Sequence, residues 1–184
     1  MASAYRGGYS ISRQEATHFL TATVVDWIEL FIRPQLADVV VESLRYCIAQ
    51  KGLEVHGWCL MPNHLHLLCT QPEGRLSDVL RDFKRHTATT ILNFLSTNQV
   101  HESRKRWLMQ RLELAAMPKA QNHKVWQAGN HAIECSERYM VDQRLAYIHD
   151  NPVKAGFVYE PHHYRYSSAV DYNGGQGLLP LVLL

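Results

Sequence analysis

The chain has few cysteines, no long hydrophobic run and little net charge. Its four cysteines are widely spaced and form no C-x-x-C pair, so the sequence does not indicate a disulfide framework. No apolar stretch approaches the roughly 18 residues that cross a membrane. Residues 1–8 lack the apolar core of a secretory signal. We therefore expect a cytoplasmic protein that has no membrane partner.

The remaining composition is that of an ordinary globular domain. The 184 residues are enough to bury a core, and 46% of them are hydrophobic while 20% are charged. The net charge of +2 is unevenly distributed, because residues 75–124 carry ten Lys and Arg against four Asp and Glu. A basic segment is expected of a surface that faces a polyanion such as nucleic acid, although a solvated helix face has the same composition.

Two histidines stand one residue apart in residues 57–69, GWCLMPNHLHLLC. A Pro-Asn turn separates two apolar runs, so residues 53–61 and 64–70 are predicted to form an antiparallel hairpin. Side chains alternate along a strand, so His64 and His66 point to one face and can serve one ligand. If they were merely buried, each imidazole would need its own hydrogen-bond partner. The pattern favours metal or phosphate chemistry over a structural role.

Structural zinc is a competing interpretation of the same stretch, because Cys59 and Cys69 flank the histidines. On the predicted strand, Cys69 lies an odd number of residues from His66 and points to the opposite face. Four ligands cannot then converge tetrahedrally, so the sequence disfavours structural zinc.

The rest of the chain alternates strand patterns, where β-formers cluster, with helix patterns, where apolar residues recur three and four apart. The predicted strands beyond the hairpin are 18–25 and 131–135, and the predicted helices are 34–51, 77–95 and 136–150, the last ended by an Asn-Pro pair. Residues 96–121 fit either a long loop or a short helix at 107–117. The order β-α-β-β-α-β predicts an α+β fold: a ferredoxin-like antiparallel sheet with two helices on one face and an additional C-terminal helix that carries a tyrosine.

The third predicted helix places Tyr147 and Asn151 four residues apart, so that they share a face. A phenol is a weak nucleophile because its pKa is about 10, but it becomes useful beside a cation that stabilises the phenolate and polarises a phosphoryl oxygen. His64, His66 and an oxygen of Asn151 could hold such a cation. Taken alone, a helical Tyr with an Asn four residues later is more often a packing feature. Together with the histidines and the basic segment, it suggests phosphodiester chemistry.

Two motifs of this chain resemble one protein family. Residues 61–68, MPNHLHLL, are similar to the histidine-hydrophobe-histidine motif of the single-tyrosine HUH transposases, the IS200/IS605-like group. Residues 147–156, YIHDNPVKAG, are similar to the tyrosine motif of their REP-associated branch. The resemblance covers residues 17–172. It implies that residues 1–184 form a single HUH domain with its core at about 17–172 and a flexible C-terminal tail at 173–184.

By this resemblance the chain is an enzyme, a transposase that nicks and joins single-stranded DNA. Tyr147 would be the nucleophile that attacks a phosphodiester, leaving a 5′-phosphotyrosine link and a 3′-hydroxyl. His64, His66 and Asn151, which replaces the glutamine of classical members, would bind Mg²⁺ or Mn²⁺, although two imidazoles also accept zinc or nickel. The implied partner is single-stranded or hairpin-forming repeat DNA. The family contains monomers as well as dimers, so a homodimer is a possible assembly.

Several cations are candidates for contacts with DNA phosphates, assigned from charge and position alone. Those of the basic segment are Lys84, Arg85, Arg104, Lys105 and Arg106. Lys154, just after the predicted tyrosine helix, is a candidate for a contact near the scissile phosphate.

Two other functions are compatible with the sequence. A non-catalytic DNA- or RNA-binding domain derived from a transposase would use the sheet as a platform, with Trp58, Tyr164 and Tyr166 stacking bases. It would bind nucleic acid whether or not a chelator is present. A hydrolase of small phosphoesters would use the two histidines with Asp150 or Glu54, and it would turn over a nucleotide analogue without the tyrosine.

Overall fold

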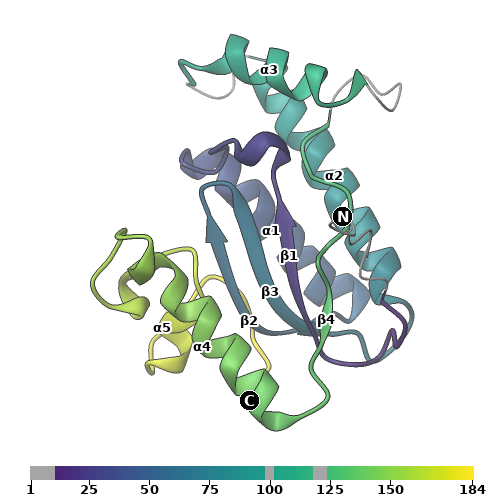
Figure 1. The fold of residues 1–184 in the computed structure, drawn as a ribbon, viewed down its shortest axis with the longest axis vertical. Coiled ribbons are helices and arrows are strands. Elements are labelled where there is room, and N and C mark those ends of the chain that lie inside the picture. The colour runs from purple at the N-terminus through teal and green to yellow at the C-terminus, as the bar shows by residue number, and fades with distance from the viewer. Residues whose placement is uncertain (1–10, 98–101, 118–123) are drawn as a thin grey trace, which may run out of the picture.

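The computed structural model describes residues 11–97, 102–117 and 124–184. In these residues the strands are β1 (His18–Thr23), β2 (Glu54–Met61), β3 (His64–Thr70) and β4 (Ile133–Glu134); the α-helices are α1 (Pro34–Lys51), α2 (Leu76–Ser96), α3 (Lys105–Leu114), α4 (Arg138–Lys154) and α5 (Ala169–Tyr172); and two short 3-10 turns are η1 (Val25–Trp27) and η3 (Pro161–His163). Figure 1 shows how they are arranged.

The strands form one sheet in the order β2-β3-β1-β4, and each neighbouring pair is antiparallel. Because α1 carries the chain across the sheet, β3 fills the position between β1 and β2. The predicted ferredoxin-like order β-α-β-β-α-β is confirmed. β4 is shorter than the predicted range 131–135, because His131 has a φ of 43°, which is incompatible with an extended strand.

The two faces of the sheet are covered by different helices. Leu65 and Leu67 of β3 point to the side covered by α1 and α2, where they belong to the larger hydrophobic cluster. Phe19 and Leu68 point to the other side and pack with Ile148 of α4. The helix layers therefore lie on opposite sides of the sheet (Figure 1), as expected from the two-residue alternation of the strands.

Local signals set the ends of α1. The helix begins with Pro34 in its first turn and ends at Gly52, whose φ of 67° is the left-handed conformation that glycine adopts easily. Its predicted bounds are confirmed. Within the range 96–121, which sequence left open between loop and helix, the structure has the helix α3. Pro118, which directly follows the predicted helix range 107–117, lies outside the described residues.

The predicted end of the tyrosine helix is wrong. The Asn-Pro pair indicates an end at about Asp150, but α4 continues to Lys154 with Pro152 inside it. One proline in the last turn removes only one hydrogen-bond donor, so the turn persists. The helix ends instead at Gly156, where φ is 77° and the N–H of Phe157 donates to the carbonyl of Pro152 at 2.9 Å. Because α4 includes this extra turn, Asn151 stays helical and lies one turn after Tyr147 on the same face.

The outer edge of β2 is covered by later parts of the chain. Three backbone hydrogen bonds join them: Leu60 N–H to Tyr166 O (2.8 Å), Ser168 N–H to Trp58 O (2.9 Å) and Val182 N–H to Val55 O (3.0 Å). Residues 173–184, interpreted from the sequence as a flexible tail, therefore lie against the sheet, with Leu179 buried. No alternating or helical pattern marks this segment, so its contact with the sheet could not be predicted from local sequence.

Ser168 connects the edge strand β2 to α4 through hydrogen bonds of its hydroxyl. We expect Ser168→Ala to lower the free energy of unfolding by about 1–3 kcal/mol. Its hydroxyl accepts from the buried N–H of Trp58 at 2.9 Å and lies 2.8 Å from Nε2 of His149. The change leaves both groups without this partner. Chemical denaturation measures the loss, and Ser96→Ala, at the exposed end of α2, serves as a control expected to change stability by less than about 0.5 kcal/mol. Equal effects of the two substitutions would contradict the assignment.

Candidate active site

The hairpin of β2 and β3 brings the two histidines together on the side of the sheet that α4 covers. His64 and His66 alternate with the buried leucines of β3 and point away from them, as predicted. Their ring centroids are 4.6 Å apart, and their Nε2 atoms are separated by 3.1 Å. The two imidazoles therefore present one ring nitrogen each to a common point.

Neighbouring polar groups fix the orientation of both rings. Nδ1 of His64 lies 2.6 Å from Oδ1 of Asn63, which can only accept, so Nδ1 carries the proton and Nε2 has a free lone pair. Nδ1 of His66 lies 3.0 Å from the hydroxyl of Thr21. Burial lowers the pKa of His64 to about 4; burial, with the positive charge of His64 as a smaller cause, lowers the pKa of His66 to about 3. Both imidazoles are neutral at neutral pH.

The spacing of these nitrogens fits two ligands of one divalent cation. With metal–ligand bonds of about 2.1 Å, adjacent corners of an octahedron are about 3.0 Å apart, close to the observed 3.1 Å. The amide of Asn151 adds a third group, with Nδ2 3.3 Å from Nε2 of His66, and turning the amide over places Oδ1 there instead. Among the described residues, no group of three or more His, Cys, Asp or Glu is gathered around a metal position. A cation here would rest on two nitrogens and one amide oxygen, which leaves positions open.

Tyr147 of α4 faces the same histidines. Its ring lies 5.2 Å from that of His66, edge to face, and 5.8 Å from that of Phe19, which in turn stacks on His66 at 5.4 Å. The tyrosine is 41% exposed and lines a hollow of about 520 Å³ that it shares with Asp150 and Lys154. A phenol, two neutral imidazoles and a carboxamide thus meet on the α4 side of the sheet, where His66 is buried, His64 and Asn151 are partly exposed, and only the tyrosine lines the hollow.

Comparison with known protein families identifies the family to which a chain with these site residues belongs. A family model described as transposase IS200 like matches residues 28–151, a range that contains both histidines, Tyr147 and Asn151. The chain belongs to the IS200-like transposase family. The family consists of DNA-processing enzymes, so the resemblance seen in the motifs is confirmed at this level.

One solved structure supports the fold of this transposase, and a second is similar at a lower TM-score. A REP-associated tyrosine transposase bound to a REP hairpin is 19% identical, with a TM-score of 0.60, and the match covers 98% of this chain and 92% of that one. A protein from Deinococcus radiodurans R1 assigned as a transposase is 18% identical, with a TM-score of 0.44, over 81% of this chain and 98% of that one. No curated protein matches the chain. At these identities the structural likeness concerns the fold alone.

The predicted cations of α2 lie away from the histidines of the transposase, on the helix layer that covers the opposite face of the sheet. Lys84 is half-buried and donates to the carbonyls of Gln127 (3.3 Å) and Gly129 (2.5 Å). Burial, with the nearby positive charge of Lys124, lowers the pKa of Lys84 to about 8. Lys84 is therefore poorly placed for a phosphate contact. Arg85 is exposed and pairs with Asp82 of its own helix at 3.1 Å.

The cations around α3 differ among themselves. Arg104 binds the fully buried carboxylate of Glu102 at 3.1 Å and the carbonyl of Glu29 at 3.0 Å, and its hydrogen bonds hold the pKa of Glu102 below its usual range. Lys105 donates to the carbonyl of Thr97 at 2.5 Å, whereas Arg106 is exposed. Near the tyrosine, Lys154 is exposed in the same hollow and pairs with Asp150 at 2.7 Å.

The structure removes several residues from the alternative functions. Trp58 is fully buried in the core, so the prediction that it stacks bases is wrong. Tyr164 and Tyr166 are partly buried, and their hydroxyls bind Leu60 O and Asp38. Glu54 pairs with Thr70, at the end of the hairpin away from the histidines. Cys69 lies in the core under α1 and α2, across the sheet from His66, which agrees with the argument against structural zinc.

Several residues at the site were missed by the sequence analysis. Thr21 and Asn63 orient the imidazoles, and Phe19 packs against both His66 and Tyr147. Strand pairing places Thr21 opposite His66, so a register prediction could have found it. Arg144, one turn before the tyrosine, lies 5.1 Å over the ring of Phe19. These contacts join residues from β1, β3 and α4, and only the folded chain brings them together.

Trp27 of η1 is another residue at the site that the sequence analysis did not identify. Its ring lies 6.0 Å from that of His64. Asp26 and Trp27 both have positive φ, 53° and 55°, a conformation that costs bulky residues about 1 kcal/mol or more each. No sequence signal marks this turn.

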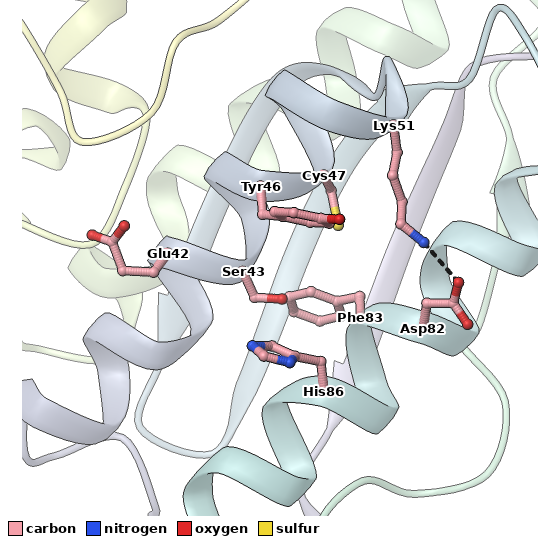
Figure 2. A pocket seen from close by; sticks show the side chains of 8 residues that line it. All are labelled: Glu42, Ser43, Tyr46, Cys47, Lys51, Asp82, Phe83 and His86. Atoms are coloured by element: carbon pink, nitrogen blue, oxygen red, sulfur yellow. Dashed lines mark hydrogen bonds and ion pairs between the residues drawn. The ribbon is translucent and has the colours of Figure 1, made fainter.

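A separate pocket lies between α1 and α2, on the face opposite the tyrosine (Figure 2). Its volume is about 450 Å³, and the ion pair of Lys51 with Asp82, 2.6 Å long, lies at one end. It contains none of the predicted site residues. The residues that line it are Glu42, Ser43, Tyr46, Cys47, Lys51, Asp82, Phe83 and His86.

Proposed function

We propose that this transposase nicks and joins single-stranded DNA through a covalent bond to Tyr147, with a divalent cation, Mg²⁺ or Mn²⁺, held by His64, His66 and Asn151. The observation that carries the proposal is the packing of the tyrosine ring 5.2 Å from His66, whose Nε2 is 3.1 Å from that of His64. The structural neighbour bound to a REP hairpin and the exposed cations support hairpin-forming repeat DNA as the substrate.

In the nicking step the phenolic oxygen of Tyr147 attacks the phosphorus of a DNA phosphodiester. The new O–P bond forms as the bond from phosphorus to the 3′-oxygen breaks; the phenol loses its proton and the departing 3′-oxygen gains one. The protein then carries the 5′-phosphate as a phosphotyrosine. Joining is the reverse: a 3′-hydroxyl attacks this phosphorus and releases the tyrosine. Because the phosphotyrosine is itself a phosphodiester and is not hydrolysed, the strand can be rejoined without another source of energy.

The chain's own residues prepare both reactants. Asn63 and Thr21 hold the imidazoles in fixed orientations, and Phe19 packs against both His66 and Tyr147, which limits the distance between them. A bound cation supplies positive charge that stabilises the phenolate and the phosphoryl oxygens. Two imidazoles and an amide leave open positions for phosphate oxygens, and a phosphate ligand favours a hard cation.

One chain supplies the whole proposed site. Tyr147 meets the histidines of its own chain, so the tyrosine acts in cis in this arrangement. We therefore propose that a homodimer, where one forms, is not needed to complete the chemistry.

A denaturing gel tests the proposal. Labelled single-stranded DNA from the gene's own flanks is incubated with the protein and Mn²⁺, and we expect a protein–DNA adduct together with a shorter strand that ends in a 3′-hydroxyl. Several flanking hairpins should be compared, because the recognised sequence is unknown. Intact DNA without adduct in every case, with binding that is indifferent to chelator, would favour a non-catalytic DNA-binding domain.

Two neighbouring arginines should separate DNA contact from stability. Arg106→Ala is expected to weaken binding of single-stranded DNA and to reduce the slope of log affinity against log salt by about 0.7, because an exposed cation releases about one counterion. Arg104→Ala is expected to lower the free energy of unfolding by about 1–3 kcal/mol, since buried Glu102 loses the guanidinium and keeps the backbone N–H of residue 104 at 2.8 Å and Arg33 at 3.4 Å. Fluorescence anisotropy measures DNA binding, and chemical denaturation measures the free energy of unfolding. If Arg104→Ala weakened DNA binding while Arg106→Ala lowered stability, the roles assigned to the two arginines would be wrong.

A further inference from the structure

The turn η1 holds an exposed tryptophan beside the proposed active site. Trp27 is 60% exposed, and its ring lies 6.0 Å from the ring of His64, edge to face. By contrast, Trp58 and Trp126 are buried in the core. A large aromatic ring is normally placed where burial stabilises the fold. Trp27 keeps much of its surface available to a ligand at the edge of the site.

The backbone holds this ring in place against its own preference. Asp26 and Trp27 have φ of 53° and 55°, which non-glycine residues rarely adopt. Arg111 fixes the turn by donating to Asp26 Oδ2 at 2.9 Å, and Asn63 Nδ2 donates to Trp27 O at 3.4 Å. Oδ1 of the same asparagine accepts from the imidazole of His64 at 2.6 Å. One side chain therefore positions both the tryptophan's backbone and the first histidine.

We propose that Trp27 stacks on a base of the DNA strand next to the scissile phosphate, as a positioning residue. The inference rests on the proposed function. A strand whose phosphate reaches the histidines must carry its neighbouring bases past the rim of the site, where this ring is exposed. Stacking on an aromatic ring accepts any base, because every base has a π face. The polar residues at this turn, Asp26 and Asn63, and the ring of His64 beside the indole suit a planar base with polar edges better than an apolar protein surface.

Abasic scanning tests this contact. The probe is a labelled hairpin with single-stranded arms from the gene's own flank, and binding is measured by anisotropy in a Tyr147→Phe background so that the strand is not cut. Trp27→Ala is expected to weaken binding of the intact probe by about 5- to 150-fold, the range for loss of one stacked base. Removing the base at one position next to the cleavage site should weaken binding to the protein that retains Trp27 by the same factor. With that abasic probe, the two proteins should bind with equal affinity.

Two further variants separate stacking from folding. Trp27→Phe keeps a ring and should recover most of the affinity. Trp107→Ala removes a tryptophan of α3 that is 48% exposed, and any loss it causes should be the same for every abasic probe. A thermal melt of each variant shows whether it is folded at the assay temperature.

The outcomes are distinguishable. Equal affinity of Trp27→Ala and the parent for the intact probe, or a loss that persists at every abasic position, would overturn the role of Trp27 while leaving the reaction intact. If the unsubstituted protein forms neither a complex nor an adduct with any flanking hairpin, the proposed function fails, and the role of Trp27 fails with it.

Discussion

Replacing Tyr147 by Phe should abolish the covalent protein–DNA adduct and the nicked strand, a loss of about 10⁴-fold or more in the rate of strand cleavage. The substitution removes one oxygen, the nucleophile, and keeps the ring that packs beside His66 and Phe19. Affinity for uncut DNA and the free energy of unfolding should therefore change little. The measurement is adduct formation with labelled DNA and Mn²⁺ on a denaturing gel, with anisotropy for binding.

Tyr159 provides the matched control, because it lies just beyond α4 and is 96% exposed. Tyr159→Phe should leave the adduct unchanged. An adduct that persists in the Tyr147 variant and disappears in the Tyr159 variant would show that Tyr159, and not Tyr147, is the nucleophile. Cleavage without any adduct, unaffected by either substitution, would instead indicate a hydrolase that uses water.

Replacing His66 by Ala should have the second largest effect, at least about 10²-fold on adduct formation, and it should remove Mn²⁺ binding measured directly by electron paramagnetic resonance. The imidazole stands at the centre of the site, within 3.1 Å of Nε2 of His64 and 3.3 Å of the amide of Asn151. The direct measurement of Mn²⁺ distinguishes loss of the cation from loss of packing around Phe19. Chelation of the unsubstituted protein with EDTA should have the same effect, reversed by added Mn²⁺.

The control is His86→Ala on the exposed surface of α2, across the sheet from the tyrosine, which should leave Mn²⁺ binding and adduct formation unchanged. If His66→Ala binds Mn²⁺ as well as the unsubstituted protein, the cation site lies elsewhere. If Mn²⁺ binding is lost but the adduct still forms, the cation is not part of the chemistry.

The parts of the fold that follow from local rules were predictable. His64 and His66 lie on one face of the sheet and Cys69 on the other, because successive side chains of a paired strand point to opposite faces. Pro34 and Gly52 marked α1 because each has a backbone preference suited to one end of a helix. The strand order followed from the sequence of elements, since few topologies are compatible with a hairpin between two helices.

The parts that depend on tertiary contacts were not predictable. Pro152 reads locally as a helix stop, but one missing donor in a last turn is tolerated. Arg104 and Lys84 look like surface cations in the sequence, yet a buried carboxylate and two carbonyls bind them. Trp27 reaches the site through a turn whose dihedral angles no sequence pattern encodes. A count of charges or rings therefore cannot say which ones face the substrate.

The coverage of β2 by residues 166–168 and by Val182 bears on how these molecules can associate. An unpaired strand edge is the usual template on which a second molecule adds its own strand. Here that position is filled from within the same polypeptide, and β4 at the other end of the sheet offers only two residues. Oligomers built by extending one sheet across two molecules are therefore disfavoured at β2. A second molecule that adds a strand at β2 must first displace residues 166–168 and Val182 from that edge.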